Sequence, residues 1–469
     1  MIYFLEATNM IIKRLIVRHL HGIYNYDVRF NNELTFIYGE NGCGKTTVID
    51  IVSSIVTGRL YNLFAYNFDE IQLFYSKTAR SKQSILSVKS ENDSYIISLN
   101  NDEMVETIED VKNVRGIISR DDNEYSLERR FINTYKFPIY LKRTFNYIYL
   151  PLSRNSQDGM DINDTSNYRR RPVSMYSEKD LVNKNYLNDS LRYVQELVRN
   201  ACMRISLKEN TINSKFRSNL LTSSLKVTSE YDIMKLLRND DKNAMEDIER
   251  SKDEYIKTLK SIAEWNAETA KQVDIFFNKY KVAYDKFRQE TDEGKSKVTV
   301  DLLLMNIEFN KIKDIASQAQ RIETEKEIAR ASKTTLLSIV NDFLSMGEDK
   351  KMLSIDEEGR IVVKVSFPQR TISMFDLSSG EKQIIIIFAC LIFGLESNQN
   401  GIYIVDEPEA SLHLAWQKHF VESIRKINNN IQLIFATHAP EIIGRYGDHS
   451  IKLIKKVDAT AIEDDTYED

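Results

Sequence analysis

Apolar residues recur with two different periods along this chain, and the change of period divides the sequence into parts. From 173 to 293, and again from 295 to 346, the sequence contains neither glycine nor proline. Within this region apolar residues lie three, four or seven positions apart, with Lys, Glu and Asp between them, which predicts long amphipathic helices. The apolar positions at this spacing are Ile248, Tyr255, Leu259 and Ile262, followed by Val273, Phe276, Tyr280, Tyr284 and Phe287.

The helical region is expected to fold back on itself. The polar segment ETDEGKSK at 290–297 separates two helical stretches and predicts the tip of an antiparallel hairpin, with the returning helix running to about Leu344. The heptads are too irregular for a long rod, so the sequence favours a short arm that is partly coiled coil. A compact helical domain without a projecting arm is the alternative.

The flanking segments have the shorter period of strands. Three strand-like runs (11–17, 26–30 and 34–39) precede a helix that begins near Lys45, and residues 83–99 alternate as a hairpin does. Later segments predict an α/β half with a parallel core. They are a hairpin at 351–366 with Gly359 in its turn, a helix at 381–395, a strand at 402–405, a helix at 412–427 and a strand at 431–436.

Composition limits the classes of protein that this chain can belong to. It has 469 residues, 42% of them hydrophobic and 28% charged, which is enough for two or three domains with buried cores. A formal net charge of −5 supplies no overall basic field, so any contact with nucleic acid would depend on local patches. The three cysteines (Cys43, Cys202 and Cys390) are widely spaced and support neither a disulfide framework nor a zinc site.

The sequence gives no sign of a membrane partner. The apolar segment at the N-terminus contains Glu6 and lacks a charged region before it, so it is a poor signal peptide. The longest apolar run, residues 384–395, is shorter than the about 20 residues that a helix needs to cross a bilayer. That run predicts a buried core helix, and the expected location of the protein is cytoplasmic.

Residues 39–47, GENGCGKTT, match the pattern G-x-x-x-x-G-K-[ST] between an apolar strand and a helix. Glycines let the backbone wrap a phosphate and aim several N–H groups at it, and the helix N-terminus adds a partial positive charge. Lys45 is expected to bridge the β- and γ-phosphates of ATP, and Thr46 to offer its hydroxyl to Mg²⁺. The predicted nucleotide-binding residues are Asn41, Gly42, Cys43, Gly44, Lys45, Thr46 and Thr47.

Two further strands end in polar residues. IYIVDEPEASLH (402–413) delivers Asp406, expected to hold Mg²⁺, and Glu407, expected to polarise the attacking water as general base. Taken alone, this stretch could be an ordinary acidic turn. LIFATHAP (433–440) ends in His438, a catalytic candidate that could hydrogen-bond the γ-phosphate, although a structural histidine is the alternative.

The loop LSSGEKQ (377–383) precedes the buried helix and has no residue that is reactive by itself. Gly380 and the serines would create a second anion-binding helix N-terminus, which is redundant within one subunit that already has a phosphate loop. The loop is therefore expected to close over the nucleotide that a second copy binds. The Ser378 hydroxyl and the Gly380 N–H would then contact the γ-phosphate. The residues expected to act in this way are Ser378, Ser379, Gly380 and Glu381.

In this order, GENGCGKT, LSSGEKQ, IVDEPEASLH and THAP resemble the ABC-type ATPase head of the SMC, RecF and OLD (overcoming-lysogenization defect) families. The resemblance implies an α/β fold, in which an ABC-type P-loop ATPase head is split by a helical or coiled-coil hairpin. It also implies ATP and Mg²⁺ as cofactors and a homodimer that sandwiches two nucleotides. The expected parts are an N-terminal lobe (1–175), the insertion (176–346), a C-terminal lobe (347–456) and an acidic tail (457–469).

The chain departs from the transporter members of this class. LSSGE stands where transporters carry LSGGQ, and Ser411-Leu412-His413 replaces their SALD-type sequence, as on the OLD and RecF side. The stretch YIYLPLSRN (147–155) resembles the segment where OLD-like ATPases return to the nucleotide, which makes Ser153 or Arg154 candidate contacts. The long insertion also argues against a transporter subunit.

No nuclease is evident in the sequence. About thirty residues follow His438, too few for the TOPRIM nuclease domain of OLD proteins, and the six histidines form no HNH or zinc pattern. The last dozen residues contain six acids, which favours a solvated tail over a metal site.

The N-terminal block, residues 18–63, resembles the ATPase subunit of the PARIS anti-phage system, with the Septu ATPase as competitor. This resemblance implies a homo-oligomeric sensor and scaffold that detects a phage protein and releases a separate nuclease, of the TOPRIM type or, for Septu, the HNH type. The alternative is a RecF-like or SMC-like DNA repair ATPase that binds duplex DNA. Its support is NYRRRP (167–172), where Arg169, Arg170 and Arg171 could neutralise phosphates, unless this is a solvated loop or a docking site for an acidic protein.

Overall fold

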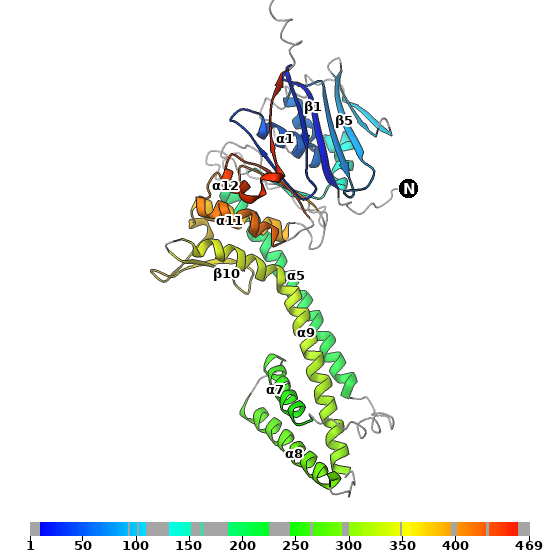
Figure 1. Ribbon diagram of the computed structural model, residues 1–469, viewed down its shortest axis with the longest axis vertical. Coiled ribbons are helices and arrows are strands. Elements are labelled where there is room, and N and C mark those ends of the chain that lie inside the picture. The colour runs from blue at the N-terminus through cyan, green and yellow to red at the C-terminus, as the bar shows by residue number, and fades with distance from the viewer. Residues whose placement is uncertain are drawn as a thin grey trace, which may run out of the picture. The chain divides into compact units, whose positions relative to one another are not determined.

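The computed structural model divides into two compact units, one formed by residues 1–201 and 332–469 and the other by residues 202–331 (Figure 1). The residues that the structure describes are 10–91, 94–100, 103–108, 131–151, 161–162, 186–224, 244–262, 266–292, 300–347, 349–394, 401–427 and 431–457.

A six-stranded sheet forms the centre of the first unit, in the order β15-β3-β14-β13-β8-β9. All neighbouring strands are parallel except the pair β8 and β9, which confirms the predicted parallel core. Strands β13 and β14 are buried along their whole length, as the continuous apolar runs in their sequences require. The strands are β3 (Leu34–Tyr38), β8 (Tyr147–Pro151), β9 (Asp161–Ile162), β13 (Ile402–Asp406), β14 (Gln432–Ala436) and β15 (Ser450–Lys452).

A second, seven-stranded sheet is antiparallel between all of its paired strands, in the order β16-β2-β1-β4-β5-β6-β7 (Figure 1). The hairpin predicted at 83–99 is confirmed as the pair β5 and β6, whereas the sequence analysis did not predict β4. The strands are β1 (Ile11–Leu20), β2 (Tyr24–Arg29), β4 (Glu70–Ser76), β5 (Ser84–Glu91), β6 (Ser94–Leu99), β7 (Met104–Ile108) and β16 (Lys456–Val457).

Helix α1 (Lys45–Val56) lies in the apolar core that the two sheets share. Its buried residues Val48, Ile51 and Ile55 belong to the same cluster as Leu15 of the antiparallel sheet and Ile404 of the parallel sheet. The helix that follows the phosphate loop is therefore packed against both sheets. Shorter elements around this core are η1 (Leu60–Ala65) and α4 (Phe137–Thr144).

The other face of the parallel sheet is covered by α10 (Ser379–Phe393) and α11 (Leu414–Arg425). The Tyr403 hydroxyl donates to the Ile387 carbonyl at 2.9 Å, whereas its neighbour Ile404 belongs to the core on the α1 side. Helix α10 is buried along most of its length, which confirms the predicted core helix. This half is completed by the short elements η2 (Met374–Asp376), α12 (Pro440–Ile443) and η3 (Gly444–His449). The C-terminal end of the long helix α9 (Val300–Ser345) also belongs to it.

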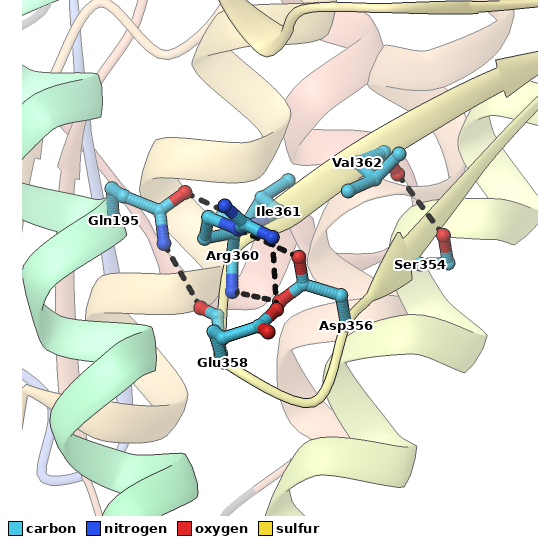
Figure 2. A network of polar contacts seen from close by, with 8 residues as sticks. Gln195, Ser354, Asp356, Glu358, Arg360, Ile361 and Val362 are labelled. Carbon is cyan, nitrogen blue, oxygen red and sulfur yellow. Dashed lines mark hydrogen bonds and ion pairs between the residues drawn. The ribbon is translucent and has the colours of Figure 1, made fainter.

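A three-stranded antiparallel sheet, β10 (Lys351–Ile355), β11 (Ile361–Val365) and β12 (Arg370–Ile372), confirms the predicted hairpin. Figure 2 shows its turn held by α5 (Tyr186–Ser224). The Gln195 amide donates to the Gly359 carbonyl at 2.9 Å and accepts from the Ile361 N–H at 3.0 Å. Gly359 has φ of +77°, which explains the glycine in this turn.

The described residues of the second unit are almost all helical, as the spacing of its apolar residues predicts. It consists of α7 (Ala244–Ile262), α8 (Ala267–Asp292) and the adjoining parts of α5 and α9, which run side by side (Figure 1). Arg330 of α9 pairs with Glu209 of α5. Residues 290–292 of the predicted hairpin tip belong to α8, and residues 293–297 lie outside the described residues. Tyr280 of α8 stacks on Phe309 of α9 with ring centroids 4.5 Å apart.

The predicted apolar stripes agree with the core of this unit in most positions. Ile248, Val273 and Tyr280 are buried there, with Tyr255, Leu259, Phe276 and Tyr284 packed around them. Phe277, which the prediction left out, is only 3% exposed and stacks edge-on against Phe309, so the stripe is wider than the sequence suggested. The side chains of Ile262 and Phe287 lie outside the described residues. In the part of the chain that the structure describes, every helix is too short or too polar to cross a membrane.

Candidate functional site

The phosphate loop connects β3 to α1. Gly42 and Gly44 have φ of +75° and +96°, a backbone region that favours glycine. A Cβ atom on Gly44 would lie 2.4 Å from the Tyr26 hydroxyl, which itself donates to the Cys43 carbonyl at 3.1 Å. Gly44 is thus required both by the backbone conformation and by the close approach of a tyrosine from the antiparallel sheet.

Lys45 is the first residue of α1, and its ammonium group lies inside the loop. Nζ donates to the carbonyl oxygens of Gly39 at 3.1 Å and Glu40 at 3.2 Å, and lies 3.8 Å from the Cys43 Sγ. The residue is only 5% exposed. The positive charge of Lys45 therefore lies within the curve of the loop backbone.

Asp406 ends β13 beside Thr46, whose hydroxyl hydrogen-bonds its carboxylate. Burial, followed by the nearby charges of Glu407, Asp50 and Glu409, raises the pKa of Asp406 to about 7, although the Thr46 hydrogen bond acts in the opposite direction. The residue is 2% exposed, and its Oδ1 has no hydrogen-bond partner among the described residues. A buried, unpaired carboxylate oxygen beside a hydroxyl is an oxygen donor set that fits Mg²⁺.

Asp50 is a residue near this site that the sequence analysis missed. It lies one helical turn after Thr46 on α1, and the signal for it was this four-residue spacing. The hydroxyls of Tyr149 and Tyr66 donate to its carboxylate at 3.2 Å and 3.3 Å. Asp50 thereby ties α1 to β8, and it adds negative charge near Asp406.

Glu407 has a φ of +50°, which is uncommon for a residue with a side chain. Its N–H donates to the Ala436 carbonyl of β14 at 2.9 Å, so the sheet itself holds this conformation. The conformation brings the side chain to the wall of the same pocket as the phosphate loop. Backbone strain of this kind is often found at functional positions.

The pocket has a volume of about 490 Å³ and brings together residues that are far apart in the sequence. Lys45, Glu407 and His438 all line it, and His438 is exposed toward solvent. Of the predicted nucleotide-binding residues, Asn41, Gly42, Gly44, Lys45, Thr46 and Thr47 line the pocket, whereas Cys43 packs toward Gly39.

One wall of this pocket was missed by the sequence analysis. It is formed by Leu20, His21, Tyr24 and Tyr26 of the β1–β2 hairpin and by Lys455, whose Nζ lies 4.5 Å from the centroid of the Tyr24 ring. The strand pair β16 and β2 brings Lys455 to this wall from more than 400 residues away, so no local pattern could have revealed it. The sequence signal that was available for this wall is the short distance between one histidine and two tyrosines in HGIYNY (21–26).

The loop at 377–383, called the signature loop from here on, is not among the residues that line this pocket. Ser378 caps α10: its hydroxyl accepts from the Glu381 N–H, and its own N–H donates to Glu381 Oε2 at 2.8 Å. Glu381 Oε1 also accepts from Lys351 Nζ at 2.8 Å, so its carboxylate is engaged within the chain. Ser378 and Ser379 are exposed, whereas Gly380 is buried against the loop that follows β13.

Several predicted residues lie outside the described part of the chain. They are Ser153, Arg154, Arg169, Arg170, Arg171 and the acidic tail from residue 458. Within the described residues, His, Cys, Asp and Glu side chains form no group of three or more that could hold a metal ion by themselves. The magnesium candidate depends instead on one carboxylate, one hydroxyl and the phosphates of a nucleotide.

A phosphate loop on a buried helix, an acidic strand end beside its threonine, and a split α/β head together define an ABC-type P-loop ATPase. The family comparison agrees with this class. The family model described as an AAA ATPase domain matches residues 10–443, and the chain therefore belongs to this ATPase family.

Individual relatives match only locally. The probable ATPase of retron Vc95 from Vibrio cholerae serotype O1 biovar El Tor is 34% identical over 96 residues, 19% of each chain. The probable ATPase of retron Ec83 from Escherichia coli is 32% identical over 94 residues, 18% of this chain and 17% of that protein. An uncharacterized protein of Dictyostelium discoideum is 34% identical over 96 residues, 19% of this chain and 12% of that protein. The chain thus spans less than a fifth of the length of each of these relatives.

The solved structures that the chain matches include the SMC head domain with an extended coiled coil from Pyrococcus furiosus. It has a TM-score of 0.39 and 11% identity, over 97% of both chains. The SMC head with coiled coil and joint from Pyrococcus yayanosii has a TM-score of 0.35 and 13% identity, over 97% of this chain and 98% of that one.

Proposed function

We propose that this chain binds ATP with Mg²⁺ in the pocket described above, hydrolyses it in a homodimer, and serves as the sensor and scaffold of a bacterial anti-phage system. The observation that carries the proposal is the convergence of Lys45, Thr46, Glu407 and His438 on one pocket of about 490 Å³. In this proposal the ATPase head comprises residues 1–175 and 347–456, and residues 176–346 form the helical insertion.

The phosphate loop holds the nucleotide. Backbone N–H groups of residues 41–46 surround the phosphates, and Lys45 exchanges its carbonyl contacts for the β- and γ-phosphate oxygens. Thr46 and Asp406 would hold Mg²⁺, which would neutralise negative charge on the phosphates. The base and ribose lie against the wall formed by His21, Tyr24 and Lys455.

Hydrolysis depends on residues at the ends of β13 and β14. Glu407 accepts a proton from the attacking water, and its backbone conformation holds the carboxylate at the pocket wall. His438 donates a hydrogen bond to the γ-phosphate and so distinguishes a triphosphate from a diphosphate. Both residues act on the same end of the nucleotide.

The signature loop acts on the nucleotide of the second copy. Ser378 and Ser379 are exposed at the first turn of α10, where the N–H groups and the helix dipole favour an anion. Glu381 stabilises the conformation of the loop through the capping box and through its ion pair with Lys351. Two nucleotides are then enclosed by two copies of the chain.

The role in defence rests on two similarities. The N-terminal block resembles the PARIS ATPase subunit, and about a fifth of the chain is similar to the retron ATPases. In this proposal the partner is a separate nuclease, of the TOPRIM type or alternatively of the HNH type, and a phage protein is the trigger.

Turnover by the Glu407→Gln variant tests the enzymatic part. We expect kcat for ATP hydrolysis to fall by about 10²- to 10⁴-fold because the neutral amide cannot accept the proton, while the affinity for ATP is retained. Lys45→Ala is the matched comparison, and it should lose affinity for ATP. Normal turnover in Glu407→Gln would exclude Glu407 as the base.

Partners can be identified by purifying tagged Glu407→Gln protein from its native host and analysing the bound chains by mass spectrometry. A nuclease recovered at a fixed ratio would support the defence role, and its motifs would distinguish the TOPRIM type from the HNH type. Recovery of DNA and replication proteins alone would instead favour a DNA repair ATPase.

A further inference from the structure

Glu409 lies three residues beyond Asp406, in the loop that follows β13, but its side chain reaches the loop that follows β14. Its Oε1 accepts the backbone N–H of His438 at 2.5 Å. Its Oε2 is buried and has no hydrogen-bond partner among the described residues. The carboxylate therefore joins the two loops that carry the proposed general base and the proposed γ-phosphate contact.

The residues on both sides of His438 are held in other ways. The Thr437 N–H donates to the Ile37 carbonyl of β3 at 3.0 Å, and the Thr437 hydroxyl accepts the Ala439 N–H at 3.0 Å. Both contacts come from the loop itself or from β3. The contact from Glu409 joins the His438 backbone to the loop that bears Glu407.

A carboxylate with one oxygen buried and unpaired is costly to keep, because desolvation of a charged group is poorly repaid by a single hydrogen bond. Glutamine would make the same contact with the His438 N–H at a lower cost of burial. Aspartate would retain the charge but is one methylene shorter, so it would not reach the N–H. These two substitutions separate the reach of the side chain from its charge.

We propose that Glu409 is a positioning residue that fixes the backbone of His438 and thereby aims its imidazole into the nucleotide pocket. The proposal rests on the function proposed above for His438. It assigns to Glu409, the third acid of the DEPE sequence (406–409), a task distinct from those proposed for Asp406 at the metal and Glu407 at the water. The positioning effect of this contact on the reaction passes through His438.

Steady-state ATP hydrolysis and the binding of a fluorescent ATP analogue test this in the full chain. We expect Glu409→Ala and Glu409→Asp to lower kcat by about tenfold or more, with analogue affinity changed less than about twofold. Glu409→Gln should stay within about threefold of the unmodified chain because it retains the acceptor oxygen. If Asp retains activity and Gln loses it, Glu409 acts through its charge and the proposal is wrong.

The double variant Glu409→Ala/His438→Ala provides the second readout. Because Glu409 acts through His438, the double variant should be no slower than His438→Ala alone. Additive losses would overturn the proposal even if Glu409→Ala were too unstable to interpret by itself, since Glu409→Asp can replace it in the cycle. If His438→Ala hydrolyses ATP normally, the role of His438 fails and this inference fails with it. A loss in His438→Ala without one in the Glu409 variants would overturn this inference alone.

Discussion

The burial of Asp406 leaves a carboxylate available for a ligand, but it lowers the stability of the folded chain when that carboxylate is charged. Burial and the nearby acids raise its pKa from 3.8 to about 7, so the folded chain holds a proton on this carboxyl more tightly than the unfolded chain does. Protonation of Asp406 therefore favours the folded state. The stability that this group contributes is present below about pH 4 and is lost as the pH rises through about 7.

We expect Asp406→Asn to raise the melting temperature at pH 8 in magnesium-free buffer, because it removes a buried carboxylate charge. The gain in the free energy of unfolding should be on the order of 2–4 kcal/mol at pH 8 and should fall below about 1 kcal/mol near pH 4. Thermal unfolding over this pH range measures it. Glu357→Gln, at an exposed acid in the β10–β11 turn, is the control and should not change the pH dependence. A variant that is less stable than the unmodified chain at pH 8 would contradict the account of Asp406.

At the scale of elements, helix α10 is joined to the loop that follows β13. The Gln383 amide of α10 donates to the Pro408 carbonyl at 3.2 Å, and Gly380 lies against the Ser411 backbone. A line of aromatic rings continues from this layer into the parallel sheet, with centroid spacings between 5.4 and 6.0 Å. The rings are Phe343, Phe388, Phe420, Phe435 and Phe36. Helix α10 and the loop at 407–413, called the acidic loop from here on, should therefore move together.

The variant Gly380→Ala tests the close packing of α10 on the acidic loop. A Cβ atom on Gly380 would lie 2.4 Å from the Ser411 carbonyl oxygen, so either α10 or the acidic loop must shift. We expect the free energy of unfolding to fall by about 1–3 kcal/mol and the ATPase rate to fall with it. Denaturant unfolding and steady-state turnover are the measurements.

Gly447→Ala is the matched control, because a Cβ atom there would meet no atom within 4 Å. Its stability should remain within about 0.5 kcal/mol of the unmodified chain. If Gly380→Ala behaved like Gly447→Ala, the close packing of α10 on the acidic loop would not be a constraint in solution.

At the scale of the whole molecule, the proposed catalytic unit is two chains, because the signature loop does not line the pocket of its own chain. Each composite site would take its phosphate loop from one copy and its signature loop from the other. A twofold arrangement makes the two sites equivalent. This arrangement predicts that two inactive variants can restore each other.

We expect mixtures of Lys45→Ala and Ser379→Glu chains to hydrolyse ATP although each variant alone is inactive. Ser379 is exposed in the first turn of α10, where an acid is compatible with the helix dipole but repels a phosphate. An equal mixture should recover about a quarter of the unmodified rate, since half of the dimers are mixed and each has one intact site. Failure to recover activity, with mixed dimers verified by two affinity tags, would exclude action of the signature loop in trans.

Much of the fold was predictable because its signals are local. The strand before the phosphate loop, the glycines at 42 and 44, the Ser378 capping box and the glycine-free helices each follow from residues within a few positions of one another. The strand β4 was missed because it pairs with β1, more than fifty residues earlier, and has no turn signal beside it. Phe277 was missed because a stripe of strict period is narrower than the face that three packed helices bury.

Short stretches of sequence were enough to identify the phosphate loop and the class of split-head ATPases, because consecutive residues form that loop. Which distant residues lie beside the loop followed only from the three-dimensional fold. It brought Lys455 to Tyr24, Glu409 to the backbone of His438, and Asp50 close to Asp406. These contacts depend on the order of strands in two sheets, and strand order is set by the burial of the whole core, which no short stretch of sequence specifies.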